Sequence, residues 1–185
     1  MASTSDFKNG LTIDMDGDVY QIVEFQHVKP GKGGAFVRTK IRKMSTGQLI
    51  DKTWRAGEKV EIARVEKRPL QFSYKVDDDF FFMDTETFDQ MILSEAQIGT
   101  QVKFLQDNLD VMVMTYNDRV IGVDLPDTIE ATVEMTDPGL KGDTASGGSK
   151  PATIDSGAVI TVPLFVNEGD RIRVDTRSAK YIERV

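Results

Sequence analysis

Hydrophobic and polar residues alternate over short stretches along most of the chain, and turn residues separate these stretches. β-Branched and aromatic residues are frequent in them, which is typical of the strands of small β-barrels or sandwiches. Helical spacing of apolar residues is clear only over about 96–108, where Ile98, Val102 and Leu105 recur. The pattern therefore predicts an all-β protein with one short helix.

The first third of the chain predicts a long hairpin with a glycine-rich tip. An alternating strand over 18–28 is followed by a turn at 29–34 and by a returning strand over 35–44. Lys32 lies in the middle of this turn. Shorter strands follow and complete a predicted five-stranded barrel, which ends near residue 64.

Strand periodicity assigns the two faces of the returning strand. Because successive side chains point to opposite faces of a sheet, Val37 and Ile41 share one face. The opposite face carries Arg38, Lys40 and Arg42. We therefore expect one basic flank on the hairpin.

The remainder of the chain predicts two further β domains. Their strands are expected at 70–76, 80–84, 109–116, 120–125, 129–135, 159–165, 171–175 and 181–185. The stretch 136–156 is expected to be loop-like, and a strand-terminating proline at position 126 places the second boundary near residue 128. The predicted domains are therefore 1–64, 65–128 and 129–185.

Composition narrows the class of protein. Hydrophobic residues make up 39% and charged residues 29% of the chain, which indicates a folded globular protein. The absence of cysteine excludes disulfides, a thiolate nucleophile and cysteine-ligated zinc. The first residues do not resemble a secretion signal, and no apolar run approaches membrane-spanning length, so we expect a cytoplasmic protein.

The charge is distributed unevenly. The net charge is −7, but residues 1–64 hold 11 basic against 8 acidic side chains, a balance of +3. Residues 65–128 hold 5 against 13, a balance of −8, and residues 129–185 hold 7 against 9, a balance of −2. A surface that faces RNA is therefore expected in the first third.

Two motifs resemble a known family. Residues 28–36, Val-Lys-Pro-Gly-Lys-Gly-Gly-Ala-Phe, resemble the hairpin tip of bacterial translation elongation factor P. Residues 142–152, Gly-Asp-Thr-Ala-Ser-Gly-Gly-Ser-Lys-Pro-Ala, resemble the C-terminal signature of that family, and 167–170 continue it. The resemblance covers the whole chain and extends to the related hypusine-containing translation factor of eukaryotes and archaea.

The resemblance implies a fold and a function. The implied fold is three small β-barrels, an SH3-like (KOW-like) barrel followed by two OB-fold barrels, in an L-shaped, tRNA-like arrangement. The implied function is not enzymatic: the factor binds the ribosome between the peptidyl and exit sites and positions the CCA end of peptidyl-tRNA. Stalling at consecutive prolines would thereby be relieved.

The resemblance also assigns roles to particular residues. Lys32 is the expected CCA contact and modification site, and the hairpin flank of Arg38, Lys40 and Arg42 is expected on the RNA backbone. The tip is supported by Lys29, Pro30, Gly31, Gly33 and Gly34. The small-subunit loop at the exit-site codon is assigned to Gly142, Asp143 and Thr144. Arg184 is a candidate tRNA contact, with a packing or solvated role as an equal alternative.

The expected partners follow from the same family. They are both subunits of the 70S ribosome, its RNA, the tRNA in the peptidyl site and, as a further candidate, an enzyme that modifies Lys32. We expect a monomer that binds no membrane, no metal and no cofactor. The one expected addition to the chain is a covalent modification of Lys32.

Other interpretations of the sequence stay open. Lys32 without the resemblance would be an ordinary surface lysine, and the chain could be a generic single-strand RNA binder or a small hydrolase that uses acidic residues. The charge of −8 over 65–128 disfavours bare RNA there, and no spaced motif indicates a catalytic pocket. The roles of His27, Trp54 and the run 80–82 are unassigned.

Overall fold

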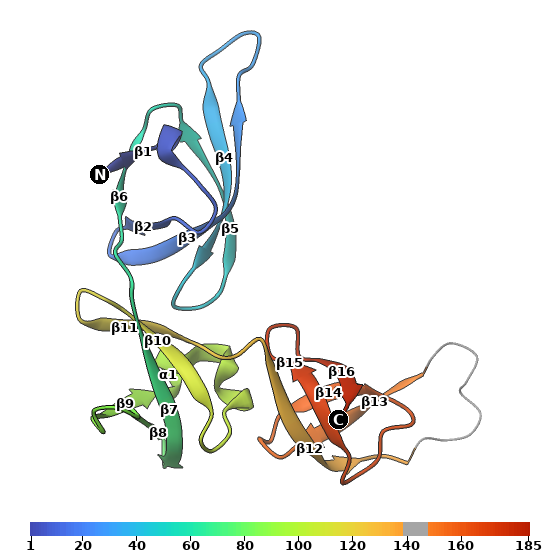
Figure 1. The fold of residues 1–185 in the computed structure, drawn as a ribbon. Helices are drawn as coiled ribbons and strands as arrows, with labels where there is room; N and C mark the ends of the chain where they lie inside the picture. The colour runs from blue at the N-terminus through green and yellow to red at the C-terminus, as the bar shows by residue number, and fades with distance from the viewer. Residues whose placement is uncertain (139–147) are drawn as a thin grey trace. The chain divides into compact units, whose positions relative to one another are not determined.

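The structure, a computed structural model, is built mostly of β-strands, and it describes residues 1–138 and 148–185 (Figure 1). The chain folds into two compact units. Unit 1 comprises Met1–Arg68 and Val113–Val123, and unit 2 comprises Pro69–Met112 and Asp124–Val185. The all-β prediction is confirmed, while the division into domains 1–64, 65–128 and 129–185 stays a prediction.

Unit 1 is built on a six-stranded sheet in the order β1-β6-β2-β3-β4-β5, called here the first sheet. Every pairing in it is antiparallel. Its strands are β1 (Ala2–Ser3), β2 (Thr12–Met15), β3 (Asp18–Val28), β4 (Phe36–Lys43), β5 (Leu49–Arg55) and β6 (Lys59–Ile62). The predicted hairpin is thus confirmed as β3 and β4, the two strands that join at the tip.

The core of the first sheet follows from the two-residue period of β4. Val37 and Ile41 are fully buried, whereas Arg38 and Arg42 on the opposite face are exposed. The predicted assignment of faces is therefore confirmed. The buried cluster consists of Phe7, Ile13, Ile22, Val37, Ile41, Trp54 and Val60.

The middle of the chain forms a five-stranded sheet in the order β11-β10-β7-β8-β9. Its strands are β7 (Glu66–Val76), β8 (Asp79–Met83), β9 (Gln90–Ser94), β10 (Asp110–Tyr116) and β11 (Arg119–Asp124). The sequence analysis did not predict β9. This strand is established by its complete antiparallel register with β8, the strand that precedes it, from Asp79↔Ser94 to Met83↔Gln90.

The helical segment of the middle sheet is shorter than predicted. An α-helix, α1, spans Glu95–Ile98, and a 3-10 helix follows over Gly99–Phe104, whereas the sequence indicated a helix up to residue 108. Gly99 directly follows α1; its amide makes the last α-helical hydrogen bond, to the Glu95 carbonyl, and its positive φ of 77° departs from helical geometry. Such a C-terminal cap stops α-helical hydrogen bonding, so apolar spacing alone overestimated the helix.

The last third closes into a barrel in the order β12-β13-β14-β16-β15, with β15 paired to β12. Its strands are β12 (Thr128–Thr136), β13 (Ser149–Ile154), β14 (Val159–Pro163), β15 (Arg171–Asp175) and β16 (Lys180–Arg184). The prediction that 136–156 is all loop was wrong at β13. Ser149 and Pro151 disguise the alternation there, but Lys150, Ala152 and Ile154 are buried, and β13 pairs with both neighbours.

The ends of β10 and β11, residues 113–123, pack on the first sheet within unit 1. The Tyr116 hydroxyl donates to Asp14 Oδ2 at 2.8 Å. Tyr116 also forms a buried apolar cluster with Val19 and Ala63. The sequence analysis did not predict this contact, because nothing in a local pattern links residues 102 positions apart.

The alternation along β4 predicts a sharp contrast between neighbouring substitutions. Ile41→Ala should lower the free energy of unfolding by about 2–5 kcal/mol, because it leaves a cavity beside buried neighbours. Arg42→Ala should change it by less than about 0.5 kcal/mol, since that side chain is exposed. Urea titration followed by the fluorescence of Trp54, the single tryptophan, measures both. Equal losses in the two variants would contradict the assignment of faces.

The contact between Tyr116 and Asp14 predicts an alkaline limit to stability. The hydrogen bond to Asp14, with burial and the charge of Glu61, raises the pKa of Tyr116, while the side chain of Asn117 opposes the rise. The stabilisation is therefore complete below the usual tyrosine pKa of about 10, and it is lost as the pH rises through the higher folded-state value.

The wild-type protein should consequently exceed Tyr116→Phe in stability at neutral pH, and the difference should shrink above about pH 10. Urea midpoints of both proteins over a pH series measure this difference. A difference that stays constant up to the alkaline end of the series would show that the hydroxyl contributes nothing through Asp14.

Candidate functional site

The tip of the β3–β4 hairpin is an open loop of exposed residues over 29–35. In Figure 1 this loop projects beyond the other strands of unit 1. Added Cβ atoms at Gly31 and Gly34 would meet nothing within 4 Å, and one at Gly33 would meet only Pro30 Cγ at 4.0 Å. The loop is therefore slender, and the described part of the protein does not crowd it.

Gly33 is the position in this loop where glycine is required by the backbone. Its φ is +108°, a region that side-chain-bearing residues rarely adopt. Pro30 has a restricted φ at the start of the turn. Lys32, between them, is exposed at the apex, where its cation can reach a neighbouring molecule.

The flank of the hairpin is less basic than β4 alone suggests. In the ladder, Glu24 and Asp51 lie on either side of Lys40, and the Lys40 Nζ is 4.0 Å from the Glu24 carboxylate. Arg38 lies between Gln26 and Thr53, and its guanidinium is 5.4 Å from the centre of the Phe36 ring. The expected basic flank is therefore a face of mixed charge, in which acidic neighbours offset Lys40.

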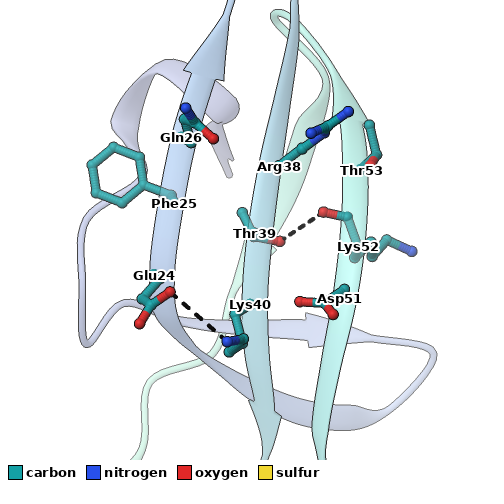
Figure 2. Close-up of a pocket in the computed structure, with 9 residues that line it drawn as sticks. All are labelled: Glu24, Phe25, Gln26, Arg38, Thr39, Lys40, Asp51, Lys52 and Thr53. Atoms are coloured by element: carbon teal, nitrogen blue, oxygen red, sulfur yellow. Dashed lines mark hydrogen bonds and ion pairs between the residues drawn. The ribbon is translucent and has the colours of Figure 1, made fainter.

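A depression of about 390 Å³ lies over the three strands of this face (Figure 2). It is lined by Glu24, Phe25, Gln26, Arg38, Thr39, Lys40, Asp51, Lys52 and Thr53. The lining offers both signs of charge, the amide of Gln26 and the hydroxyl of Thr53. It can therefore take up a polar ligand or a backbone phosphate, but it holds no histidine for proton transfer near neutral pH.

Buried hydrogen bonds stiffen the sheet under this depression. The Trp54 indole Nε1 donates to Thr39 Oγ1 at 2.8 Å, and the Thr39 hydroxyl donates to the Lys52 carbonyl at 3.1 Å. The Phe7 ring meets Trp54 edge-on, with ring centroids 5.5 Å apart. Trp54 is thus a core residue, as is common for aromatic residues in strands.

Two other unassigned features also have structural explanations. His27 is exposed and meets the Phe25 ring edge-on at 5.6 Å between centroids. Phe80 and Phe82 are buried, whereas Phe81 points to the other face and stacks on Tyr74 at 4.6 Å. Packing therefore accounts for most of these aromatic side chains.

The acidic runs of the sequence form turns. Asp16 has a positive φ of 57°, and the Gly17 amide donates to Asp14 Oδ1, which gives a tight turn between β2 and β3. Asp18 pairs with Lys43 at 2.7 Å. Within 1–138 and 148–185, no three acidic or histidine side chains gather as metal ligands would. No helix in these ranges is long and apolar enough to cross a membrane.

The predicted residues of the C-terminal barrel are not part of the hairpin. Gly142, Asp143 and Thr144 lie outside the described residues. Arg184 is exposed on β16, and its guanidinium is 3.7 Å from the Asp170 carboxylate. Only the hairpin residues, from Lys29 to Arg42, are therefore brought together on one element.

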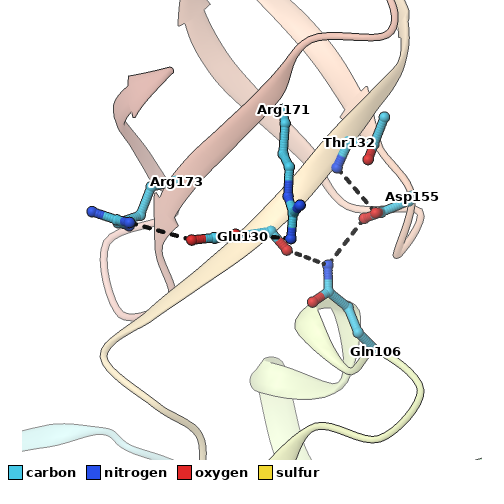
Figure 3. A network of polar contacts seen from close by, with 6 residues as sticks. All are labelled: Gln106, Glu130, Thr132, Asp155, Arg171 and Arg173. Atoms are coloured by element: carbon cyan, nitrogen blue, oxygen red, sulfur yellow. Dashed lines mark hydrogen bonds and ion pairs between the residues drawn. The ribbon is translucent and has the colours of Figure 1, made fainter. Parts of the chain in front are cut away.

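The barrel is joined to the helical segment inside unit 2 by a polar network (Figure 3). Gln106 Nε2 donates to the Glu130 carbonyl and to Asp155 Oδ1, both at 3.0 Å. The other oxygen of Asp155 accepts from the Thr132 amide. Glu130 in turn pairs with Arg171 at 2.9 Å and with Arg173 at 3.2 Å. These arginines are thus engaged within the protein.

Family models of elongation factor P match nearly the whole chain. The KOW-like domain matches residues 3–60, the OB domain matches 65–123, and the C-terminal model matches 129–184. These matches and the three sheets confirm the predicted fold class.

Full-length relatives give the same result. Proteins named elongation factor P from Moorella thermoacetica and Pelotomaculum thermopropionicum are each 55% identical, over 184 and 185 residues, with 100% of both chains covered.

Solved structures of another family share the fold. One titled eukaryotic translation initiation factor 5A from Methanococcus jannaschii has a TM-score of 0.51 at 22% identity, over 68% of this chain and 90% of that chain. An eif-5a family protein from Naegleria fowleri has a TM-score of 0.53 at 16% identity, over 67% and 96%.

The loop geometry predicts which tip substitutions disturb folding. Lys32→Ala and Gly31→Ala should change the free energy of unfolding by less than about 0.5 kcal/mol, because both positions are exposed and uncrowded. Gly33→Ala should cost about 1 kcal/mol or more, since its positive φ strains any side chain. Urea unfolding of the three variants tests this order. A Gly33→Ala protein as stable as Gly31→Ala would disprove the backbone requirement.

Proposed function

Since the chain belongs to the elongation factor P family, whose members are translation factors and not enzymes, we propose that it relieves ribosomes stalled at consecutive prolines. It binds the 70S ribosome between the peptidyl and exit sites and contacts the CCA end of peptidyl-tRNA with Lys32. The peptidyl transfer itself remains the chemistry of the ribosome.

The observation that carries this proposal is the slender, exposed tip on a long, well-anchored hairpin. Its anchor is the buried cluster around Val37, Ile41 and Trp54. The anchor extends almost to the loop, because the buried Val37 pairs with His27 on β3 and with Trp54 on β5. The exposed tip, residues 29–35, therefore begins directly beyond a packed part of the hairpin. A narrow probe of this kind suits a confined site built of RNA.

The tip acts through position and charge. Lys32 provides a compact cation on a flexible stem, which suits phosphate and ribose oxygens. Contact with the CCA end reduces the freedom of the peptidyl-tRNA, so that less entropy is lost on the way to the reactive geometry. Proline, whose ring restricts its backbone, gains most from such an orientation effect. The factor therefore needs no nucleophile and no general base.

The flank of the hairpin holds the tip in place. Arg38 and Arg42 are exposed along β4, and together with Lys40 they can contact backbone phosphates beside the tip. Because Glu24 and Asp51 border Lys40, the two arginines provide most of this attraction.

Further contacts complete the proposal. Gly142, Asp143 and Thr144 reach the small subunit near the exit-site codon, and Arg184 is a second candidate for tRNA after release from Asp170. A modifying enzyme extends Lys32 covalently, which would lengthen the probe. The factor works as a monomer in the cytoplasm.

The decisive experiment is translation of a reporter with consecutive prolines in a reconstituted system, beside a proline-free reporter. The protein should relieve stalling on the proline reporter alone. Lys32→Ala should reduce that relief by about tenfold, because one charge-assisted hydrogen bond is lost. Lys59→Ala is the matched control, because Lys59 is an exposed lysine on β6, away from the hairpin. Modified and unmodified protein are both assayed.

Two results would overturn the proposal. If the properly modified protein changes neither reporter, the chain does not act at prolines. If Lys32→Ala and Lys59→Ala are equally active, the relief does not pass through the tip. A protein that instead accelerates both reporters alike would indicate a general effect on peptide-bond formation.

A further inference from the structure

We propose that the ends of β10 and β11 form a seat that sets the direction of the β3–β4 hairpin, with Tyr116 and Gly122 as its positioning residues. The seat is defined on one side by Tyr116, Ile121 and Gly122. On the other side it is defined by Asp14 and Val19 of the first sheet and by Met44 and Ala63, which directly follow β4 and β6. The role assigned to it rests on the proposed function of Lys32.

The hydrogen bond between Tyr116 and Asp14 gives the seat its direction. The two groups come from strands far apart in the chain, and the bond is 2.8 Å long. Asp14 is itself held, because its other oxygen accepts from the Gly17 amide in the β2–β3 turn. A hydrogen bond to an ionised group is directional and strong, so it favours one orientation of β10 on the first sheet.

Gly122 gives the seat its close fit. A Cβ at this position would lie 3.1 Å from the Met44 carbonyl oxygen and 3.2 Å from Met114 Cε. Met44 cannot yield freely, because its amide donates to the Val19 carbonyl at 2.9 Å. The missing side chain of Gly122 therefore permits an approach of backbone to backbone that any other residue would widen.

Apolar contact supplies the remaining stabilisation. Val19, Ala63 and Tyr116 are buried together, and Met44, Val65 and Ile121 pack around them. Such burial favours association but has little directional preference. The polar contact of Tyr116 and the steric fit of Gly122 are thus the two features that select one orientation.

The seat lies at one end of β3 and the tip lies at the other. Val19 is in the seat, and Val28 precedes the tip on the same strand. At about 3.3 Å per residue, the nine steps between them span about 30 Å. A tilt of about 10° at the seat would therefore displace the tip by about 5 Å. Displacements near 1 Å already cost about a hundredfold where reacting groups must be aligned.

Loosening the seat should affect binding before it affects the chemistry. A protein whose tip points correctly only part of the time binds with an affinity reduced by that fraction. Once it is bound, the tip is in place and the maximal relief is unchanged. A weakened seat and a missing Lys32 therefore differ: the first raises the half-saturating concentration, and the second lowers the maximal effect.

The first measurement determines the rigidity of the seat. The chain has no cysteine, so spin labels can be attached at two introduced cysteines, Gln26→Cys on β3 and Glu86→Cys in the turn before β9. Pulsed dipolar spectroscopy gives the distribution of distances between them. Tyr116→Phe and Gly122→Ala should each widen that distribution, while Tyr74→Phe, which removes a hydroxyl from a half-exposed tyrosine, should leave it unchanged.

The second measurement determines the role. Unlabelled Tyr116→Phe and Gly122→Ala, shown to unfold cooperatively, should raise the half-saturating concentration on the proline reporter about fivefold and retain the maximal relief, as a competent fraction near one fifth requires. Asp14→Asn, which keeps one acceptor oxygen and replaces the other with an N–H donor, should lie between Tyr116→Phe and the wild type. Tyr74→Phe is again the control.

The outcomes separate the two hypotheses. The positioning role is overturned if the distance distribution is as narrow in both variants as in the wild type. It is also overturned if the distribution widens while the half-saturating concentration in translation stays unchanged. If the wild-type protein has no effect on the proline reporter, the proposed function falls and the positioning role falls with it. The distance measurement then still shows whether the contact is rigid.

Discussion

The burial of Val37 and Ile41 beneath β4 is the constraint on which the rest of unit 1 depends. Since strand side chains alternate, burying these two obliges Arg38 and Arg42 to face outward. The same burial fixes the register of β3, and hence the place at which the two strands leave the core and turn. The charged side chains on this face of β4 are consequently positioned by packing of the opposite face.

Two polar side chains, one buried and one partly buried, reinforce that constraint in the first sheet. Thr39 connects the Trp54 indole to the Lys52 carbonyl, and so it satisfies two polar groups in the interior. Asp14 connects the β2–β3 turn to Tyr116. Each of these side chains connects two segments by directional hydrogen bonds. Apolar packing alone would let these segments shift relative to each other, so the polar side chains help to fix the geometry of the sheet.

Local pattern was sufficient to predict most of the longer strands and both faces of the hairpin, because alternation and glycine placement are properties of neighbouring residues. It was insufficient for β9 and β13, which contain polar residues and were established only by their pairing with the adjacent strands, β8 for β9 and both β12 and β14 for β13. Local pattern also overestimated the positive charge of the flank. Glu24 and Asp51 become neighbours of Lys40 only when β3 and β5 pair with β4, which the sequence of β4 does not show. The contact between Tyr116 and Asp14 could not be predicted either, because the two residues are far apart in the chain and share no local sequence pattern.

The alternation of acidic and basic side chains across β3, β4 and β5 has a consequence for how the hairpin meets polyanions. A cation that already has a carboxylate beside it, as Lys40 has Glu24, exchanges one neutralising partner for another when it meets a phosphate. Few counterions are then released from nucleic acid, and the entropy gained is small. The net charge of −7 for the whole chain likewise disfavours non-specific attraction to RNA.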